Sequence, residues 1–349
     1  MPSLAEHAKD YSHGYCSLRI LVTWLVVSFA LCLIYAIIAF LSLLDKNILP
    51  EEPGPLSLPY TNVPRRYDIH LKFDTEYNRS NKTFSGTVSV LFSSRHANQR
   101  LFLHKGENLR IMEFSLRAVD HPDEKRSVKK GTYNSATEIQ TFVLSFDTST
   151  DTAYLFTVTF NGVMTGEAGP NEFHYDSENN EKRYGVWFAT FQRRGKGLRY
   201  LFPCMDSNEF AAEYNVTVTR KSSLRALSNF VVKQSFQSGV NLMTDHFPST
   251  MVLLPYQFSL ILCDFQYKRE LNNETMISIY SQSSLLSNAS FRRIVQFADL
   301  SSKTIGKNDV VVIPNAKTLY RPGISIINEK EFVSESKEFQ MTTARPVQH

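Results

Sequence analysis

The sequence is poor in features that mark several protein classes. It has only four cysteines in 349 residues and no Cys-x-x-Cys pair, which excludes a disulfide-rich scaffold and a cysteine-based metal site of the usual spacing. The net charge of +4, with 21% charged residues, gives no reason to expect a nucleic-acid partner. Without repeats or low-complexity blocks, the length predicts a folded chain of about two domains.

Paired histidines are also missing. None of the nine histidines stands four residues from another, the spacing that puts two imidazoles on one helix face to bind zinc. No metal site is predicted from them, and His104, which lies in an apolar strand pattern, is expected to be a packing or hydrogen-bonding residue.

One long apolar run lies near the N-terminus. Ile20–Leu44 contains no charged residue and exceeds the ~20 residues that a helix needs to cross a bilayer. Lys9 and Arg19 precede it and acidic residues follow it, so the N-terminus is predicted to be cytosolic. The chain is therefore expected to be a single-pass type II protein of the plasma membrane. Its first parts are a cytosolic tail, a signal anchor and a proline-rich stalk: residues 1–19, 20–44 and 45–62.

The remainder is expected to be extracellular and glycosylated. Five N-glycosylation sequons on this side begin at Asn78, Asn81, Asn215, Asn273 and Asn288. The cysteines of this part are Cys204 and Cys263. Two alternatives are open for them, a single disulfide in an oxidising compartment or two buried free thiols.

After the stalk, apolar and polar residues alternate. Residues 67–73 place every second side chain on one face, and similar runs rich in β-branched and aromatic residues follow. These runs are 87–92, 101–104, 139–146, 154–160, 184–191, 214–219, 230–237 and 258–265. The pattern predicts a mainly β, antiparallel domain over 63–267, with a hydrophilic connection at 120–131.

The pattern changes after Glu270. Apolar residues between Leu285 and Ile305 have helical spacing, and Asp309–Pro314 has the composition of a buried strand. We expect a second, α/β unit over 268–349, which at ~80 residues is small for an independent core.

The stretch from Trp187 to Tyr214 carries a specific signature. Its residues 189–192 and 199–206 resemble "A-T-T-Q-x-E" and "A-R-x-x-F-P-C-x-D-E-P" of the zinc aminopeptidases related to aminopeptidase N. Other family motifs follow the same order along the chain. They are "P-x-x-Y-x-L-x-L" at 64–71, "F-x-G-x-V" at 84–88, "L-H" at 103–104, "A-L-S-N" at 226–229 and "D-F" at 264–265.

This resemblance implies a saddle-like β-sandwich followed by the start of a thermolysin-like catalytic domain, here incomplete. In the family, that domain carries a Gly-Ala-Met-Glu-Asn loop and a His-Glu-x-x-His helix that binds zinc. Neither is intact in this chain. Val347-Gln348-His349 resembles the lead-in to the zinc helix, but a single histidine cannot hold catalytic zinc. We therefore expect no cofactor in this chain, and zinc only if the chain continues past His349.

The resemblance also assigns substrate-binding positions, and these are degenerate. Gln192 is kept, but Arg194 stands where the family has Glu or Gln for the substrate's α-ammonium. If Gly323 matches the glycine after the family's loop, Tyr320 replaces the loop's glutamate. A fixed cation such as Arg194 facing that ammonium would weaken substrate binding by ~1 kcal/mol or more at short range. No catalytic residue is predicted.

Three hypotheses are open. The first is a membrane-anchored, non-catalytic relative that binds peptides or proteins, or pairs with an active aminopeptidase. The second is the N-terminal part of a zinc aminopeptidase that releases N-terminal amino acids from peptides, with its His-Glu-x-x-His helix beyond residue 349. The third is an incomplete fold that leaves Phe291, Phe297 and Val310–Ile313 without cover.

Overall fold

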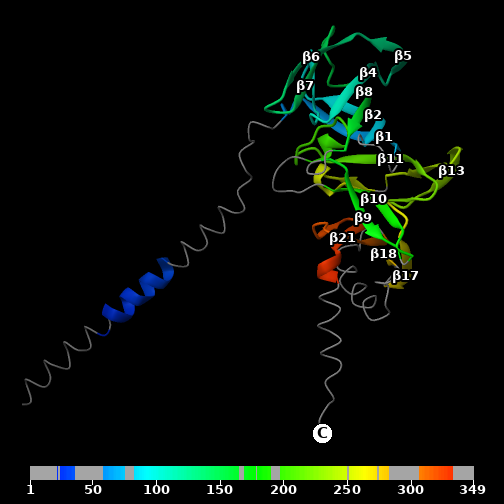
Figure 1. Cartoon of the computed structure of the whole chain (residues 1–349). Coiled ribbons are helices and arrows are strands. Elements are labelled where there is room, and N and C mark those ends of the chain that lie inside the picture. The colour runs from blue at the N-terminus through cyan, green and yellow to red at the C-terminus, as the bar shows by residue number, and fades with distance from the viewer. Residues whose placement is uncertain are drawn as a thin grey trace, which may run out of the picture. The chain divides into compact units, whose positions relative to one another are not determined.

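The computed structural model describes residues 22, 24–35, 58–74, 82–164, 169–177, 179–189, 197–249, 251–272, 275–282 and 306–332. The chain divides into two compact units, Met1–Gly54 and Pro55–His349 (Figure 1). Each unit has its own structure and is described by itself.

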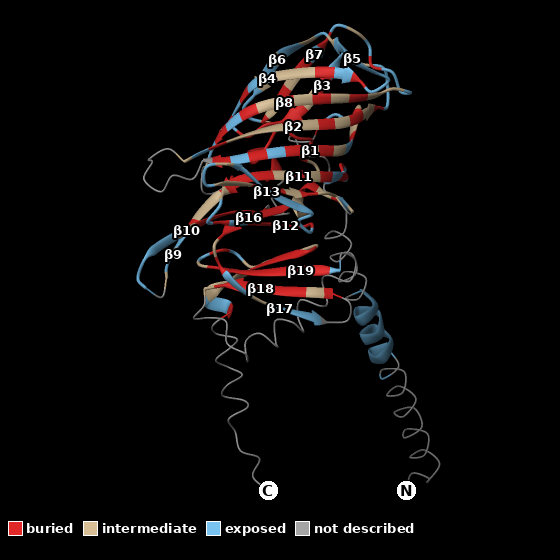
Figure 2. Cartoon of the chain, turned by 90° about the vertical axis from the view of Figure 1, so that its right-hand side faces the viewer, coloured by how far each residue is buried: buried red, intermediate tan, exposed pale blue. Residues whose placement is uncertain are grey.

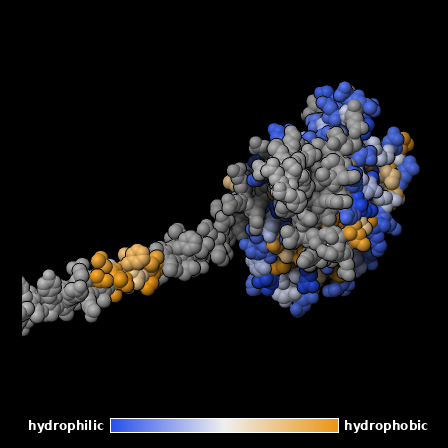
Figure 3. All heavy atoms as spheres, turned by 90° about the horizontal axis from the view of Figure 1, so that it is seen from below, coloured by the Kyte–Doolittle hydropathy of each residue, from blue (hydrophilic) through white to orange (hydrophobic). Residues whose placement is uncertain are grey.

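In the first unit, residues 24–35 form an α-helix. Its large apolar side chains are exposed, among them Trp24 at 71%, Phe29 at 68% and Tyr35 at 77%, and Figure 3 shows the helix as a hydrophobic segment. Within the part of the chain that the structure describes, no helix is long and apolar enough to cross a membrane. The predicted anchor, Ile20–Leu44, reaches past this helix at both ends into positions outside the described residues.

The largest sheet of the second unit has nine strands in the order β13–β14–β11–β1–β2–β8–β4–β5, with β15 paired to β11. They are β1 (Asn62–Asp74), β2 (Thr83–Ser94), β4 (Leu109–Ala118), β5 (His121–Arg126), β8 (Ala153–Val163), β11 (Ala212–Lys221), β13 (Gln234–Gly239), β14 (Leu242–Phe247) and β15 (Val252–Leu253). All neighbours are antiparallel except β1 and β11, which are parallel. The prediction of a purely antiparallel sheet is therefore wrong for the pair β1 and β11. Parallel neighbours require a long crossover connection, and here the chain from β2 to β10 forms it.

Two smaller sheets pack against the apolar face of this sheet, which makes the fold a β-sandwich. One consists of β3 (Arg100–His104), β7 (Ile139–Leu144) and β6 (Val128–Asn134), and the other of β12 (Arg225–Ser228), β16 (Ser259–Cys263), β10 (Lys182–Ala189) and β9 (Asn171–Asp176). Ring centroids of Phe142 in β7 and Phe156 in β8 are 4.7 Å apart. Those of Phe258, just before β16, and Tyr214 in β11 are 5.6 Å apart. The sheets share one hydrophobic core.

The alternating pattern predicted the central strands well. β2 and β8 bury every second residue (Figure 2). The hydrophilic connection predicted at 120–131 is wrong, because β5 and most of β6 lie there. Both are edge strands with mostly exposed, polar side chains, so no apolar alternation marks them.

The four-stranded sheet is buried on both faces. Val186 and Phe188 of β10 lie in the core of the sandwich, whereas Trp187 and Ala189 belong to a second apolar cluster. Successive side chains of a strand point to opposite faces, so β10 contributes to both cores. A strand of this kind has a continuous apolar sequence rather than an alternating one.

The second cluster joins this sheet to a five-stranded sheet in the order β17–β18–β19–β21–β20. Its strands are β17 (Gln266–Asn272), β18 (Thr275–Ser281), β19 (Lys307–Ile313), β20 (Leu319–Arg321) and β21 (Ile324–Asn328). The buried strand predicted at Asp309–Pro314 is confirmed as β19. Val310–Ile313 are at most 1% exposed, so the expectation that they lack cover is wrong. The helix predicted between Leu285 and Ile305, with Phe291 and Phe297, lies outside the described residues.

Candidate functional site

The Ala-Leu-Ser-Asn segment at 226–229 connects the sandwich to the five-stranded sheet. Asn229 is fully buried. Its Nδ2 donates to the carbonyl of Gln257 over 2.9 Å and to that of Pro322 over 2.8 Å, and its Oδ1 accepts from the Ser259 N–H over 2.8 Å. The amide is thus satisfied at both ends, and it fixes three backbone segments to one another.

A buried ion pair supports the same junction. The Lys307 Nζ donates to the carbonyl of Ser228 over 2.8 Å and pairs with the Asp309 carboxylate over 2.6 Å. Lys307 and Asp309 are each 7% exposed, and Ser228 is fully buried. The charge of the lysine is therefore balanced where the two sheets meet.

Pro322 belongs to the hairpin that carries Tyr320. Arg321 pairs with Ile324 across β20 and β21, which leaves Pro322 and Gly323 as a two-residue turn. Gly323 has φ of +73°, and proline followed by such a glycine is typical of a type II turn. The hydrogen bond from Asn229 therefore holds the tip of this hairpin.

The hairpin presents no carboxylate. Tyr320 is 52% exposed in β20, which is an edge strand of its sheet. The guanidinium of Arg321 lies 5.8 Å from the ring centre of Tyr256, and burial lowers the pKa of Arg321. Residues 315–328, all of them described, include no acidic residue. The exposed side chain of Tyr320 therefore offers a phenol on this hairpin, not a carboxylate.

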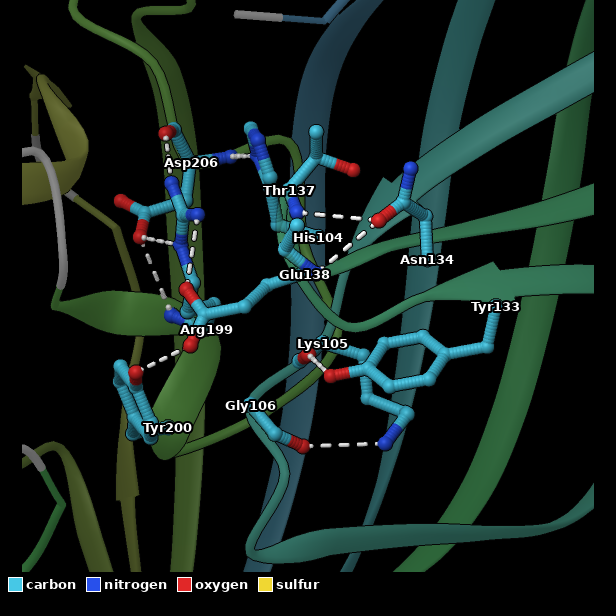
Figure 4. A network of polar contacts seen from close by, with 11 residues as sticks. His104, Lys105, Gly106, Tyr133, Asn134, Thr137, Glu138, Arg199, Tyr200 and Asp206 are labelled. Atoms are coloured by element: carbon cyan, nitrogen blue, oxygen red, sulfur yellow. Dashed lines mark hydrogen bonds and ion pairs between the residues drawn. The ribbon is translucent and has the colours of Figure 1, made fainter. Parts of the chain in front are cut away.

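The Phe-Pro-Cys-Met-Asp segment at 202–206 lies beside a buried charge network (Figure 4). Arg199 is 1% exposed. Its Nε donates to Asp206 Oδ2 over 2.8 Å and its Nη1 to Glu138 Oε2 over 3.2 Å, and its Nη2 donates to the Asp206 carbonyl over 3.0 Å. The Tyr200 hydroxyl donates to the other oxygen of Glu138. Both carboxylates are occupied by these partners.

His104 completes the network as a hydrogen-bond acceptor. Its Nδ1 accepts from the Asp206 N–H over 3.1 Å, and its backbone pairs with that of Cys204 over 2.8 and 3.1 Å. Burial raises the pKa of Asp206, although the Arg199 guanidinium opposes the shift. His104 is 0% exposed, so this cluster supports the fold and offers no group to a substrate. Its prediction as a hydrogen-bonding residue is confirmed.

Sequence reasoning missed Glu138. It follows the polar end of β6 and has a φ of +58°, and its carbonyl accepts from the Lys105 N–H over 2.8 Å. Neither motif nor periodicity marks the residue. The available signal was a general rule, that arginines are almost never fully buried unless they are paired. A buried Arg199 therefore leads one to look for carboxylates besides Asp206.

Cys204 and Cys263 are free and buried, so of the two alternatives the structure has the unbridged thiols. Burial raises the pKa of Cys204 well above its usual value and that of Cys263 to about 12. Such thiols are inert in packing positions. Among the described residues, no group of three or more His, Cys, Asp and Glu side chains is arranged to hold a metal ion.

Several predicted site residues lie outside the described residues: Gln192, Arg194, His349 and the sequon residues Asn78, Asn81, Asn273 and Asn288. Asn215 is described in β11. Its Nδ2 donates to Asp68 Oδ1 over 2.7 Å, and its Oδ1 accepts from the Ser249 N–H over 2.8 Å.

A cavity of about 420 Å³ lies beside the β9–β10 hairpin and is lined by Tyr175, Arg183 and Asp264 among other polar residues. Arg183 Nη1 donates to Asp264 Oδ2 over 2.9 Å, and the Tyr175 hydroxyl donates to Oδ1. Burial raises the pKa of Asp264. Within this cavity, Arg183 and Asp264 thus pair with each other, and the carboxylate of Asp176 also lines it.

The fold and these motifs define the class. Residues 63–256 match the peptidase M1 N-terminal domain, which is more than half of the chain, so the chain belongs to the peptidase M1 family through this domain. It is 22% identical to human endoplasmic reticulum aminopeptidase 1 over 325 residues, 84% of this chain and 32% of that protein. It is 22% identical to dog aminopeptidase N over 311 residues, 79% of this chain and 32% of that protein.

A further relative is the human thyrotropin-releasing hormone-degrading ectoenzyme, 23% identical over 282 residues, 76% of this chain and 25% of that protein. The chain thus spans about a third or less of the length of these relatives. The predicted kinship with aminopeptidase N is confirmed.

Proposed function

We propose that this chain is a membrane-anchored M1 family member whose extracellular part binds peptides or proteins without hydrolysing them. The hairpin of β20 and β21 carries the proposal, because it presents Tyr320 and Arg321 where the family resemblance leads us to expect a glutamate. A phenol does not neutralise the α-ammonium of a peptide, and no acidic residue stands in 315–328 to do so. We therefore expect weak binding of a free peptide N-terminus in the manner of the aminopeptidases.

The same hairpin offers a different mode of binding. In the sheet order, β20 has no second neighbour among the described strands. An extended peptide that adds to such an edge gains main-chain hydrogen bonds that do not depend on its terminal charge. Peptides with blocked and free N-termini are then expected to bind with similar affinity. An exposed strand of a larger partner, such as an active aminopeptidase, is expected to bind in the same way.

Membrane anchoring is supported by three observations. Ile20–Leu44 is free of charge, the helix at 24–35 exposes apolar side chains, and the sequons lie on one side of this run. We propose a type II orientation in the plasma membrane with the sandwich outside the cell. A relative whose name includes "ectoenzyme" agrees with this orientation.

The test uses the full chain purified in detergent. We expect no hydrolysis of aminoacyl fluorogenic substrates, no stoichiometric zinc, and binding of an extended peptide library that is unchanged by N-terminal acetylation. Stoichiometric zinc together with chelator-sensitive turnover would overturn the proposal, as would a tenfold or larger preference for free N-termini.

A second candidate is an active zinc aminopeptidase of which this chain is the N-terminal part. The relatives named above favour it, since they are aminopeptidases and are covered only in part. Sequencing of the transcript past the codon for His349 tests it: a continuation that encodes Glu-x-x-His and a later glutamate supports this candidate.

A further inference from the structure

The cavity of about 420 Å³ beside the β9–β10 hairpin lies where two sheets meet. It is lined by the end of β9 and the turn that follows, the start of β10, the connection from β16 to β17, and the end of β18. Small-molecule sites often occupy cavities of this size between packed parts of a fold. In the five-stranded sheet, β17 and β18 lie at the edge opposite β20, so this cavity is separate from the hairpin of Tyr320 (Figure 1).

Four side-chain amides line the cavity, and none of them makes a hydrogen bond to another described residue. They belong to Asn179, Asn180, Gln266 and Gln282. Each amide carries a donor and an acceptor next to each other. A sugar hydroxyl is also both donor and acceptor, so these amides can pair with hydroxyl groups without a change of protonation.

Asp264 presents its carboxylate in a fixed position. Arg183 Nη1 donates to Asp264 Oδ2 over 2.9 Å, and the Tyr175 hydroxyl donates to Oδ1. The other end of the guanidinium, Nη2, donates to Glu181 Oε2 over 3.1 Å. A carboxylate has about four acceptor sites and a guanidinium five donors, so further acceptors and donors remain side by side. Such a pair matches two neighbouring hydroxyl groups of a sugar ring.

The ring of Tyr175 adds an apolar surface to this polar lining. Tyr175 is partly buried, and its ring centre lies 5.1 Å from that of Phe265 and 6.2 Å from that of Phe173. Both phenylalanines are 4% exposed, so they support the tyrosine ring from the core. The C–H face of a pyranose packs on an aromatic ring of this kind, while its hydroxyl groups need polar partners around the edge.

We propose that this cavity binds a small neutral saccharide, with the amides and the Arg183–Asp264 pair on its hydroxyl groups and Tyr175 on its C–H face. Charge selects among saccharides. Asp176 and Asp264 face the cavity with one cation, Arg183, so a carboxylated or sulfated sugar is repelled. This activity is additional to the peptide-binding edge at β20.

A basic peptide side chain fits the cavity less well than a saccharide. Arg183 already occupies the carboxylates of Asp264 and Glu181. Of the carboxylates named here, only the exposed Asp176 has no partner among the described residues. A single exposed carboxylate binds a cation weakly, and the four amides add no charge to it.

The test is titration of the full chain by saturation-transfer NMR, in a detergent without a sugar headgroup and after removal of any N-linked glycans. The probes are the methyl glycosides of glucose, galactose, mannose and N-acetylglucosamine, at up to about 10 mM because ligands of this size bind weakly. At least one neutral glycoside is expected to bind saturably. The methyl glycosides of glucuronic acid and sialic acid are expected to bind at least tenfold more weakly.

Two variants place the binding in this cavity. Gln266→Ala removes one amide from an exposed strand position and is expected to weaken binding roughly fivefold. Tyr175→Leu removes the ring and is expected to weaken it roughly five- to tenfold, and Tyr175→Phe, which keeps the ring, less than Tyr175→Leu. Gln234→Ala, at an exposed position of β13, is the matched control and is expected to bind as the wild type does.

Asp176→Asn tests the role of charge. It keeps an acceptor and removes one negative charge, so the discrimination against glucuronic acid is expected to fall. The proposal is overturned if none of the four neutral glycosides binds saturably, or if Gln266→Ala and Tyr175→Leu bind them as Gln234→Ala does. It is also overturned if the acidic glycosides bind as strongly as the neutral ones, or if a lysine-rich peptide displaces the bound glycoside.

Discussion

The side-chain amide of Asn229 donates to the carbonyl of Pro322 over 2.8 Å, although the two residues are 93 positions apart. This bond ties a residue of the β-sandwich to the turn that carries Tyr320. The Ala-Leu-Ser-Asn segment thereby has a physical role, since its asparagine sets where the hairpin of β20 and β21 lies. The exposed position of Tyr320 depends on this junction.

Replacement of Asn229 by alanine is expected to destabilise the second unit. The carbonyls of Gln257 and Pro322 and the N–H of Ser259 lose their partner in a buried place, which costs about 1–3 kcal/mol in the free energy of unfolding. Thermal unfolding of the full chain in detergent measures the loss. The control is Asn179→Ala, since Asn179 is exposed. Equal midpoints for the two variants would contradict this role of the junction.

Replacement of Arg199 by methionine is expected to have a larger effect. It leaves Asp206 and Glu138 as buried carboxylates without a cation, and loss of one member of a buried ion pair destabilises by about 3–5 kcal/mol. Denaturant unfolding and yield of folded protein are the measurements. Arg110→Met, at an exposed position of β4, is expected to change stability by less than about 0.5 kcal/mol. A stable Arg199 variant would show that the network does not support the fold.

The sequence predicted the central strands because each has one buried and one partly exposed face. β1, β2, β8 and β11 bury alternate residues, and this alternation is visible in their sequences. Edge strands β5 and β6 escaped prediction, because an exposed strand has no apolar period. β10 and β16 contribute to two cores at once and show continuous apolar runs.

The candidate site was predictable only in part. The missing acid at Tyr320 followed from a family motif, and the structure adds that Tyr320 is exposed on an edge strand. The roles of Glu138 and Asn229 depend on contacts between residues far apart in the chain, at separations of 61 and 93 positions. Local sequence patterns do not report such contacts. Arg194 stays a prediction.

The buried thiols are expected to resist alkylation in the folded protein. With a pKa of about 12 for Cys263, roughly one thiol in ten thousand is ionised at pH 8, and the thiolate is the reactive form. Mass spectrometry after iodoacetamide treatment is expected to find Cys204 and Cys263 unmodified until denaturant is added. Val143→Cys supplies an exposed control thiol, since Val143 in β7 is 42% exposed. Rapid native labelling of Cys263 at the control rate would contradict its burial.

The carboxyl group of Asp264 is expected to make stability depend on pH. Burial raises its pKa in the folded state and outweighs the opposing effect of a backbone hydrogen bond. The folded protein therefore holds this proton more tightly than the unfolded chain. The resulting stability is fully present below the unfolded pKa of about 3.9 and is lost as pH rises through the folded pKa.

Asp264→Asn removes this titration and keeps the shape of the side chain. The free energy of unfolding, measured from pH 4 upward, is expected to fall less steeply for the variant than for the wild type. Asp123→Asn, in the exposed strand β5, is the control and should leave the slope unchanged. A steeper fall for Asp264→Asn would reverse the sign argued here.

Tyr320→Glu tests the proposed function at its central residue. The substitution restores a carboxylate on an exposed hairpin position, where it attracts the α-ammonium of a peptide. We expect binding of a free N-terminal peptide to become about tenfold stronger than that of its acetylated form, a difference of about 1.4 kcal/mol. Tyr320→Gln has similar size without the charge and is expected to show no such preference. Because β20 remains an edge strand in both variants, acetylated peptides are expected to bind each variant with the affinity that they have for the wild type. A preference that appears equally in both variants would show that size, not charge, selects the ligand at Tyr320.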